Sequence, residues 1–200
     1  MTGGFWYCFI YCILRFVLFF YHPVLHVKGR ENIPPDGSYV ICPNHSGLMD
    51  PVWVIIAMRI GHIPRIMAKK ELMEKPVLGW ILAHIGVIGV DRGNADIHAI
   101  KEGLRCLKNG QQLLIFPEGT RKKPGKTVTA KRGAVTLAQR TDVPILPVYL
   151  TEKRHPFGPM TCVFGKPYHL DFGGQKPTDE QLEAATQELM EKIYQMGEQT

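Results

Sequence analysis

A histidine and an aspartate five residues apart could together perform acid–base chemistry. His45 and Asp50 bracket the segment His-Ser-Gly-Leu-Met-Asp, with Pro51 directly after it. On a regular α-helix this separation turns two side chains about 140° apart, so the pair can meet only if the chain between them bends. A histidine held by a carboxylate is suited to removing a proton from a hydroxyl group. Taken alone, the spacing favours a plainer interpretation, in which Asp50 caps a helix that starts at Pro51 and His45 lies in a surface loop.

A second segment, residues 116–121, offers groups that can hold an anion. Its sequence is Phe-Pro-Glu-Gly-Thr-Arg, and Arg121 can grip a phosphate through two hydrogen bonds. Glu118 can orient a substrate hydroxyl or hold Arg121 in place. The positive charge continues without an acidic interruption through Lys122, Lys123, Lys126, Lys131 and Arg132. A solvated loop is the structural alternative.

Two further segments carry weaker signals. Residues 86–92 end in Asp91-Arg92, which makes Arg92 a second candidate phosphate ligand, with a turn or an ion pair to Asp91 as the alternative. Residues 143–148, Val-Pro-Ile-Leu-Pro-Val, indicate only a strand framed by prolines. The sequence has no glycine-rich nucleotide loop, HExxH or GxSxG, so nucleotide-binding, zinc-protease and serine-hydrolase functions lack their usual signals.

The cysteines and the charge narrow the chemistry further. Five cysteines without a CxxC pair argue against a zinc site or a disulfide framework, so we expect no metal and no resident cofactor. Cys42 is close enough to His45 in sequence to consider a Cys–His nucleophile, but its apolar run favours a buried side chain. The formal net charge of +6 favours a polyanionic partner: nucleic acid, an anionic lipid surface or a phosphorylated substrate.

The elements that must position these segments alternate between strands and helices. Short apolar runs predict strands at 39–42, 63–68, 87–90, 112–116, 145–150 and 161–164. Helical spacing predicts helices at 52–60, 70–85, 95–108, 131–140 and 178–196. This alternation predicts an α/β fold with a mixed central sheet flanked by helices, formed by a domain over residues 27–200.

Residues 1–26 contain an aromatic-rich apolar stretch, 5–21. About 20 apolar residues are needed to span a bilayer, and Arg15 in the interior of the stretch would be costly there. We therefore expect a membrane-associating helix that lies in one leaflet, with a buried core helix as the alternative. No basic residue precedes the stretch and no small-x-small site follows it, which argues against a signal peptide. The expected location is the cytoplasmic face of the cell membrane, as a peripheral or monotopic protein.

Together the four segments resemble the glycerolipid acyltransferase family, specifically the 1-acyl-sn-glycerol-3-phosphate acyltransferases. The motifs N-H-x-x-x-x-D, G-x-I-x-V-D-R, F-P-E-G-T-R and V-P-I-x-P-V all occur here, in the family's order, and the resemblance covers roughly residues 27–166. It implies transfer of a fatty acyl group from acyl carrier protein or coenzyme A to the free hydroxyl of lysophosphatidic acid, giving phosphatidic acid for phospholipid synthesis. The acyl thioester is then a co-substrate, and the partners are the lysolipid and an anionic membrane surface rather than nucleic acid.

The resemblance also implies a role for each candidate residue. His45 would be the base and Asp50 would orient it. The phosphoglycerol head would be bound by Arg92, Glu118, Gly119, Thr120 and Arg121, with Lys131 as a weaker addition. Backbone amides near Ser46-Gly47 or Gly119 are candidate donors to the oxyanion. Glycerol 3-phosphate or another lysolipid is the alternative acceptor, and a non-catalytic protein that binds anionic membranes is the alternative outside enzymes.

Overall fold

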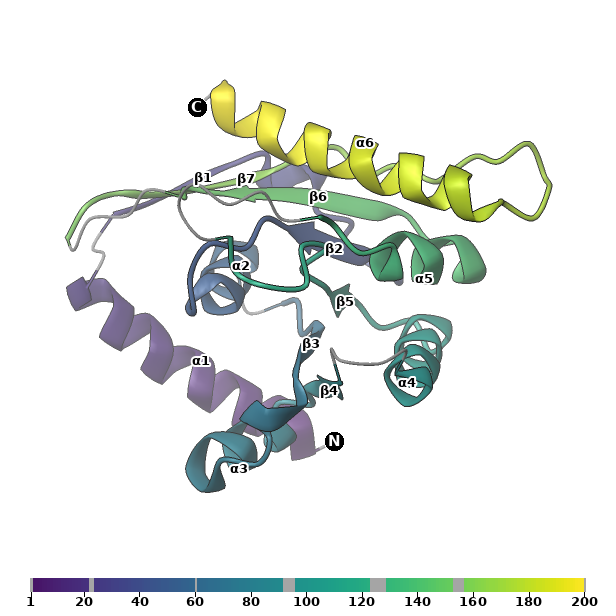
Figure 1. Ribbon diagram of the computed structural model, residues 1–200. Coiled ribbons are helices and arrows are strands. Elements are labelled where there is room, and N and C mark those ends of the chain that lie inside the picture. The colour runs from purple at the N-terminus through teal and green to yellow at the C-terminus, as the bar shows by residue number, and fades with distance from the viewer. Residues whose placement is uncertain are drawn as a thin grey trace.

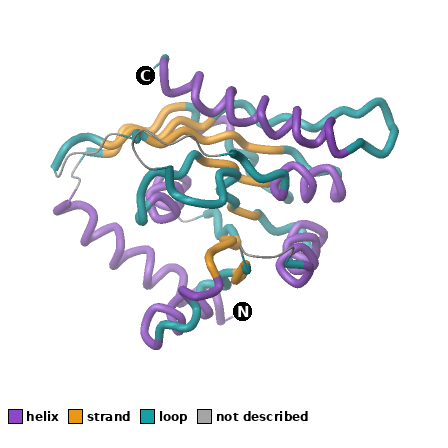
Figure 2. The backbone as a smooth tube through the Cα atoms, in the orientation of Figure 1, coloured by secondary structure: helices purple, strands orange, loops and turns teal. Residues whose placement is uncertain are grey.

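Seven strands form one sheet, in the order β1-β7-β6-β2-β5-β3-β4 (Figures 1 and 2). The computed structural model describes residues 2–21, 24–59, 61–91, 96–122, 129–152 and 157–199. The strands are β1 (Leu25–Lys28), β2 (Val40–Pro43), β3 (Arg65–Lys69), β4 (Ile88–Val90), β5 (Leu113–Leu114), β6 (Ile145–Leu150) and β7 (Met160–Phe164). All neighbouring strands pair in parallel except β6 and β7, which are antiparallel, so the predicted mixed sheet is confirmed.

Helices cover both faces of this sheet. They are α1 (Thr2–Tyr21), α2 (Asp50–Met58), α3 (Pro76–His84), α4 (Ile97–Lys108), α5 (Gly133–Thr141) and α6 (Asp179–Glu198), with short 3₁₀ turns η1 (Arg30–Asn32) and η2 (Lys70–Leu72). Figure 1 shows α1 and α2 on one side of the sheet and α4 and α5 on the other, with α6 lying along β6.

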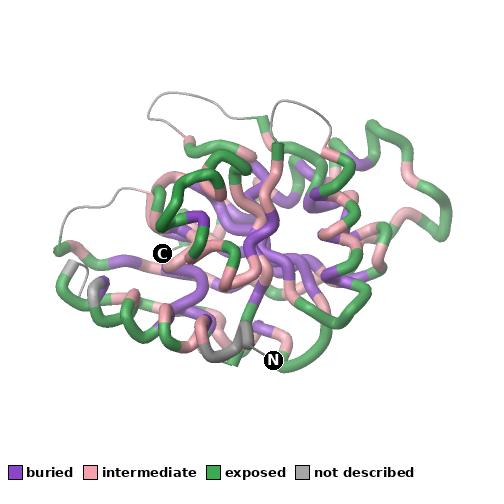
Figure 3. The backbone as a smooth tube through the Cα atoms, turned by 90° about the horizontal axis from the view of Figure 1, so that it is seen from below, coloured by how far each residue is buried: buried purple, intermediate pink, exposed green. Residues whose placement is uncertain are grey.

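The central strand β2 shows why the sequence forms this layered structure. Its four residues are all buried, and successive side chains point to opposite faces. Val40 and Cys42 join the core beneath α4, α5 and α6, whereas Ile41 joins the core beneath α1 and α2. A continuous apolar run is therefore required, since neither face meets water. In Figure 3 the buried positions are concentrated in the central strands, and exposed positions lie along the outer helices.

Several predicted boundaries were wrong. The single helix predicted over 70–85 is divided into η2 and α3, because Pro76 excludes the helical conformation from the residue before it. Lys75 is accordingly extended, with φ −76° and ψ 124°. The strand predicted over 112–116 pairs only at Leu113–Leu114, and the helix predicted from residue 131 begins at Gly133. Strand β1 was not predicted.

The N-terminal stretch forms the predicted helix, and it packs on the domain. Tyr7, Tyr11 and Leu18 are buried in the same core as α2, so α1 and the sheet share one hydrophobic core. Other apolar side chains of α1 face outward: Phe9, Ile13, Phe16, Phe19 and Phe20. Within the described ranges, no helix has the length and apolar character needed to cross a membrane.

Candidate active site

The site lies where parallel strands end, at the edge of an α/β sheet that commonly binds ligands. Strand β2 ends at Pro43 and α2 begins at Asp50, so residues 44–49 form the connecting turn. Asn44 ties the start of this turn to the end of β6. Its Nδ2 donates to the Leu150 carbonyl at 2.9 Å, and the Leu150 amide donates to its Oδ1 at 2.7 Å.

His45 and Asp50 meet, as the predicted bend requires. The distance from His45 Nδ1 to Asp50 Oδ2 is 2.8 Å. The same carboxylate oxygen accepts hydrogen bonds from the amides of Ser46 (2.7 Å) and Gly47 (2.8 Å), which fold the turn around it. A carboxylate only accepts, so Nδ1 carries the proton and Nε2 presents a lone pair. That tautomer is the one a general base needs.

The predicted role of Asp50 as a helix cap was wrong. Met49 occupies the cap position and Asp50 is the first residue of α2, with Pro51 following within the first turn. The side chain of Asp50 turns back to the two turn amides and to His45 instead of reaching the first amides of its own helix. The chemical interpretation of the spacing therefore fits the structure better than the plainer one.

Glu118 holds the backbone of His45. It is only 2% exposed, and its Oε1 accepts hydrogen bonds from the His45 amide at 3.1 Å and from the Tyr194 hydroxyl at 2.8 Å. Burial raises the pKa of Glu118, and the two hydrogen bonds oppose that rise. Glu118 does not form an ion pair with Arg121 in the part of the chain that the structure describes, so the predicted hold on Arg121 is not seen.

Two more contacts fix the position of His45. The Lys122 amide donates to the His45 carbonyl at 2.8 Å. The Phe116 ring lies against the imidazole, with ring centroids 4.1 Å apart and planes inclined by 31°. The backbone and the ring are thus both held before any substrate binds, which is what efficient proton transfer requires.

Tyr194 is the residue that sequence reasoning missed. It lies near the end of α6, a helix that the sequence indicated to be purely structural. Its hydroxyl contacts Glu118, and its ring receives the Lys122 ammonium at 4.3 Å from the centroid. A tyrosine in an amphipathic helix more than seventy residues from Glu118 carries no local signal of this contact.

A cavity of about 200 Å³ adjoins the cluster. Phe116, Gly119 and Lys131 line it, together with residues of β3, β4, α4 and α5. Gly119 has φ +64°, and a Cβ there would lie 3.1 Å from the Lys131 side chain. The turn therefore favours glycine, and it lets the lysine pass close to the backbone.

The other predicted substrate-binding residues that the structure describes are not among the residues that line this cavity. Arg92 lies outside the described residues, although the preceding Asp91 lines the cavity. Thr120 and Arg121 are exposed on the turn that follows Gly119. In the described ranges no group of three metal-ligating side chains occurs.

Two alternatives from the sequence do not fit the geometry. The amides of Ser46 and Gly47 donate to Asp50, and the Gly119 amide donates to the Phe116 carbonyl at 3.0 Å, so the candidate oxyanion donors are already engaged. Cys42 is fully buried on the α4–α6 side of the sheet, and burial raises the pKa of its thiol, which disfavours the nucleophilic thiolate.

Comparison with known proteins decides the family. The protein-family model described as Acyltransferase matches residues 24–151 of the sequence. This range contains His45, Asp50 and the loop through Arg121. The chain belongs to the acyltransferase family. It is 34% identical over 178 residues to the 1-acyl-sn-glycerol-3-phosphate acyltransferase of Bacillus subtilis. These aligned residues cover 85% of this acyltransferase and 86% of that protein.

Other relatives agree with this assignment. The 1-acyl-sn-glycerol-3-phosphate acyltransferase of Borreliella burgdorferi is 36% identical over 126 aligned residues. These residues cover 62% of this acyltransferase and 50% of the Borreliella protein. Among solved structures, the 1-acyl-sn-glycerophosphate acyltransferase of Thermotoga maritima matches with a TM-score of 0.63 and 27% identity, over 87% of this chain and 72% of that one.

Proposed function

We propose that this acyltransferase moves a fatty acyl group from an acyl thioester to the free hydroxyl of 1-acyl-glycerol 3-phosphate, giving phosphatidic acid. The observation that carries the proposal is the His45–Asp50 pair at 2.8 Å, beside a cavity lined by Gly119 and Lys131. Relatives that bear the name of this activity match 85% and 62% of the chain.

The first chemical step belongs to His45. Its Nε2 accepts the proton of the acceptor hydroxyl while that oxygen attacks the thioester carbonyl carbon. Asp50 stays ionised and stabilises the imidazolium that forms. When the tetrahedral intermediate collapses, the carbon–sulfur bond breaks and the imidazolium returns the proton to the departing sulfur. The products are an ester and a free thiol, and no acyl-enzyme is needed because the thiolate is a good leaving group.

The acceptor's phosphate would be bound by Lys131, which lines the small cavity, together with Arg92 and Arg121. Arg121 and Lys131 belong to the loop that follows β5, and Arg92 follows β4. Thr120 completes the proposed site for the phosphoglycerol head, and Gly119 contributes by letting the Lys131 side chain pass close to the turn. Glu118 faces the His45 amide, so we expect it to affect the acceptor chiefly by positioning the turn that carries His45. Either coenzyme A or acyl carrier protein can present the thioester that this chemistry needs.

We also propose that the protein binds to the cytoplasmic surface of the membrane through α1 and α3. Exposed apolar side chains occur on both helices, including Phe16 (67%) and Val77 (75%). The helices adjoin each other, since the rings of Trp6 and Trp80 lie edge to face with centroids 5.4 Å apart. An exposed apolar surface of this kind indicates contact with a membrane or a partner, and the acceptor is itself a lipid.

Thiol release tests the proposed reaction. Purified protein is given acyl-coenzyme A or acyl carrier protein thioester, with lysophosphatidic acid or glycerol 3-phosphate as acceptor. We expect thiol release that depends on lysophosphatidic acid and is lost in His45→Ala, while circular dichroism and vesicle binding stay unchanged. Full activity in His45→Ala would contradict the mechanism, and preference for glycerol 3-phosphate would contradict the acceptor.

A further inference from the structure

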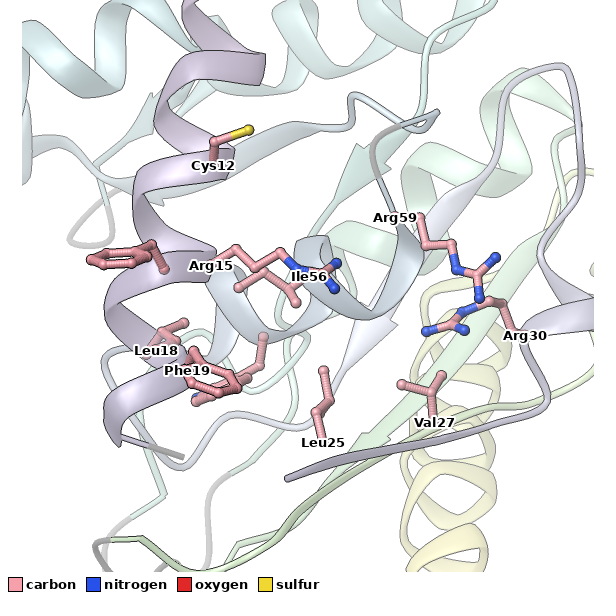
Figure 4. Close-up of a pocket in the computed structure, with 11 residues that line it drawn as sticks. Cys12, Arg15, Leu18, Phe19, Leu25, Val27, Arg30, Ile56 and Arg59 are labelled. Atoms are coloured by element: carbon pink, nitrogen blue, oxygen red, sulfur yellow. The ribbon is translucent and has the colours of Figure 1, made fainter. Parts of the chain in front are cut away.

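A second cavity, of about 680 Å³, lies between α1, β1 and the end of α2 (Figure 4). It is distinct from the proposed reaction site, because neither His45 nor Asp50 lines it. Trp53, one turn after Asp50 on α2, is the part of its wall closest to Asp50 along that helix. Arg59 lies nine residues after Asp50, roughly 13 Å along the helix at 1.5 Å per residue. Much of its wall is apolar, including Leu18, Leu25 and Trp53.

Three arginines from different elements line this apolar cavity. Arg15 comes from α1, Arg30 from η1 and Arg59 from the end of α2 (Figure 4). Arg30 is anchored, because its Nε donates to the Ala57 carbonyl at 2.9 Å, and this leaves its terminal N–H groups for another acceptor. Figure 4 shows the Arg30 and Arg59 guanidinium groups near each other, with the Arg15 side chain extending from α1 toward the same cavity.

Among the described residues, no side chain compensates the positive charge of this arginine cluster (Arg15, Arg30 and Arg59). No carboxylate lines the cavity among the described residues, and none of the three arginines forms an ion pair with a described residue. Partial burial lowers the pKa of Arg30, and the positive charges of Arg59 and Arg15 lower it further. Like charges gathered in a partly apolar cavity repel each other, so an anion bound among them would be strongly stabilised.

The entrance of the cavity indicates where such an anion would come from. Phe16 and Phe19 line the cavity, and they are also 67% and 61% exposed on the outer side of α1. The cavity thus adjoins the surface that we propose meets the membrane. A ligand entering from there would place a charged head among the arginines and an apolar chain along Leu18, Leu25 and Trp53.

We infer that the arginine cluster binds the phosphate head of one anionic phospholipid from the membrane surface. Guanidinium groups match phosphate oxygens through paired hydrogen bonds, and the apolar wall matches an acyl chain. This site is distinct from the one that binds the acceptor lysolipid. The inference rests on the proposed membrane binding of α1, and it is independent of the acyl-transfer reaction.

Vesicle binding by matched variants tests the inference. The 200-residue protein is mixed with vesicles of phosphatidylcholine alone and of phosphatidylcholine with phosphatidylglycerol, and bound protein is measured by sedimentation. The cavity variant carries Arg15→Gln, Arg30→Gln and Arg59→Gln. The control variant loses the same charge beside α3, on the proposed membrane-facing side but outside the cavity, through Lys69→Gln, Lys70→Gln and Lys75→Gln. Because these lysines also lie near the proposed membrane surface, both variants weaken the general attraction of a basic protein to an anionic surface by a similar amount.

The expected result is a difference between the two variants. One lost charge-assisted contact to phosphate lowers affinity by about tenfold or more, so the cavity variant should lose at least about tenfold more affinity for the anionic vesicles than the control. Binding to phosphatidylcholine alone should be equal in both. If the triple variant fails to fold, the double variant Arg15→Gln/Arg59→Gln, which keeps the anchored Arg30, should show the same direction.

Other outcomes separate the proposals. Equal loss in the cavity and control variants would overturn the lipid site while leaving membrane binding intact. Failure of the unchanged protein to bind either vesicle would overturn membrane binding and the lipid site together. Lipid-selective binding without thiol release would support the lipid site and contradict the proposed reaction.

Discussion

Replacement of Asp50 by asparagine should separate the hydrogen bonds of this carboxylate from its negative charge. A single oxygen, Oδ2, accepts hydrogen bonds from His45 Nδ1 and from the amides of Ser46 and Gly47. In Asp50→Asn an amide oxygen at the same position can accept all three. The reverse orientation would put the amide N–H groups against two backbone N–H donors, so the two turn amides fix the orientation. The histidine should therefore keep its tautomer and lose only the negative charge beside it.

The magnitude follows from the loss of that charge. Hydrogen bonds to charged groups contribute about 1.5–3 kcal/mol and neutral ones about 1 kcal/mol, so the transition state loses about 1–2 kcal/mol. This corresponds to a roughly 5- to 30-fold fall in kcat/KM. A reversed tautomer costs far more, about 10⁴-fold in kcat in the serine-protease triad.

The assay is thiol release at saturating thioester and varied lysophosphatidic acid, with His45→Ala as the inactive reference. Asp50→Ala is the structural control: it leaves the Ser46 and Gly47 amides without their acceptor, and we expect the free energy of unfolding to fall by about 2–4 kcal/mol. Asp50→Asn should unfold close to the unchanged protein. If Asp50→Asn were folded yet as inactive as His45→Ala, the orientation argument would be refuted.

Three further predictions concern the surroundings of His45. Burial raises the pKa of Glu118, so its ionised form destabilises the fold at neutral pH. The urea midpoint of unfolding should therefore be higher in Glu118→Gln than in the unchanged protein at neutral pH. The difference between the two midpoints should disappear on acidification, because Glu118 is then protonated in both the folded and the unfolded state. A lower midpoint for Glu118→Gln at neutral pH would contradict this. Tyr194→Phe removes one hydrogen bond to Glu118 and should lower kcat by roughly three- to tenfold, at about 1 kcal/mol, with little change in acceptor KM; an effect confined to KM would exclude a positioning role. Arg121→Ala should raise the KM for lysophosphatidic acid by about tenfold or more, and an unchanged KM would remove Arg121 from the phosphate site.

The sequence was informative wherever the structure depends on local order along the chain. Alternation of apolar runs with helical spacing predicted the α/β fold, because a strand buried on both faces must be apolar throughout. The run Thr178-Asp179-Glu180-Gln181 has the sequence pattern of a capping box, and the structure forms that box, since it involves only residues within one turn. The spacing of His45 and Asp50 showed only that the chain must bend if the two side chains are to meet, and that they do meet was implied by the resemblance of the four motifs to a known family.

The sequence was less informative where a boundary depends on pairing. The extended run at 112–116 has strand composition throughout, but only Leu113 and Leu114 find ladder partners in β2 and β3. Helix α3 starts late because Pro76 restricts Lys75, an effect that helical spacing alone does not reveal. The edge strand β1 depends on pairing with β7, more than a hundred residues away.

By itself, therefore, the sequence determined the fold class, and through its four motifs it indicated the His45–Asp50 pair and the loop that carries Glu118 and Arg121. Only the tertiary structure decided that Glu118 faces the His45 amide, that Tyr194 of α6 supports Glu118, and that Arg15, Arg30 and Arg59 share one cavity. The physical reason is distance along the chain. Contacts within a turn are fixed by backbone geometry, whereas contacts between distant elements exist only after the sheet has set their positions.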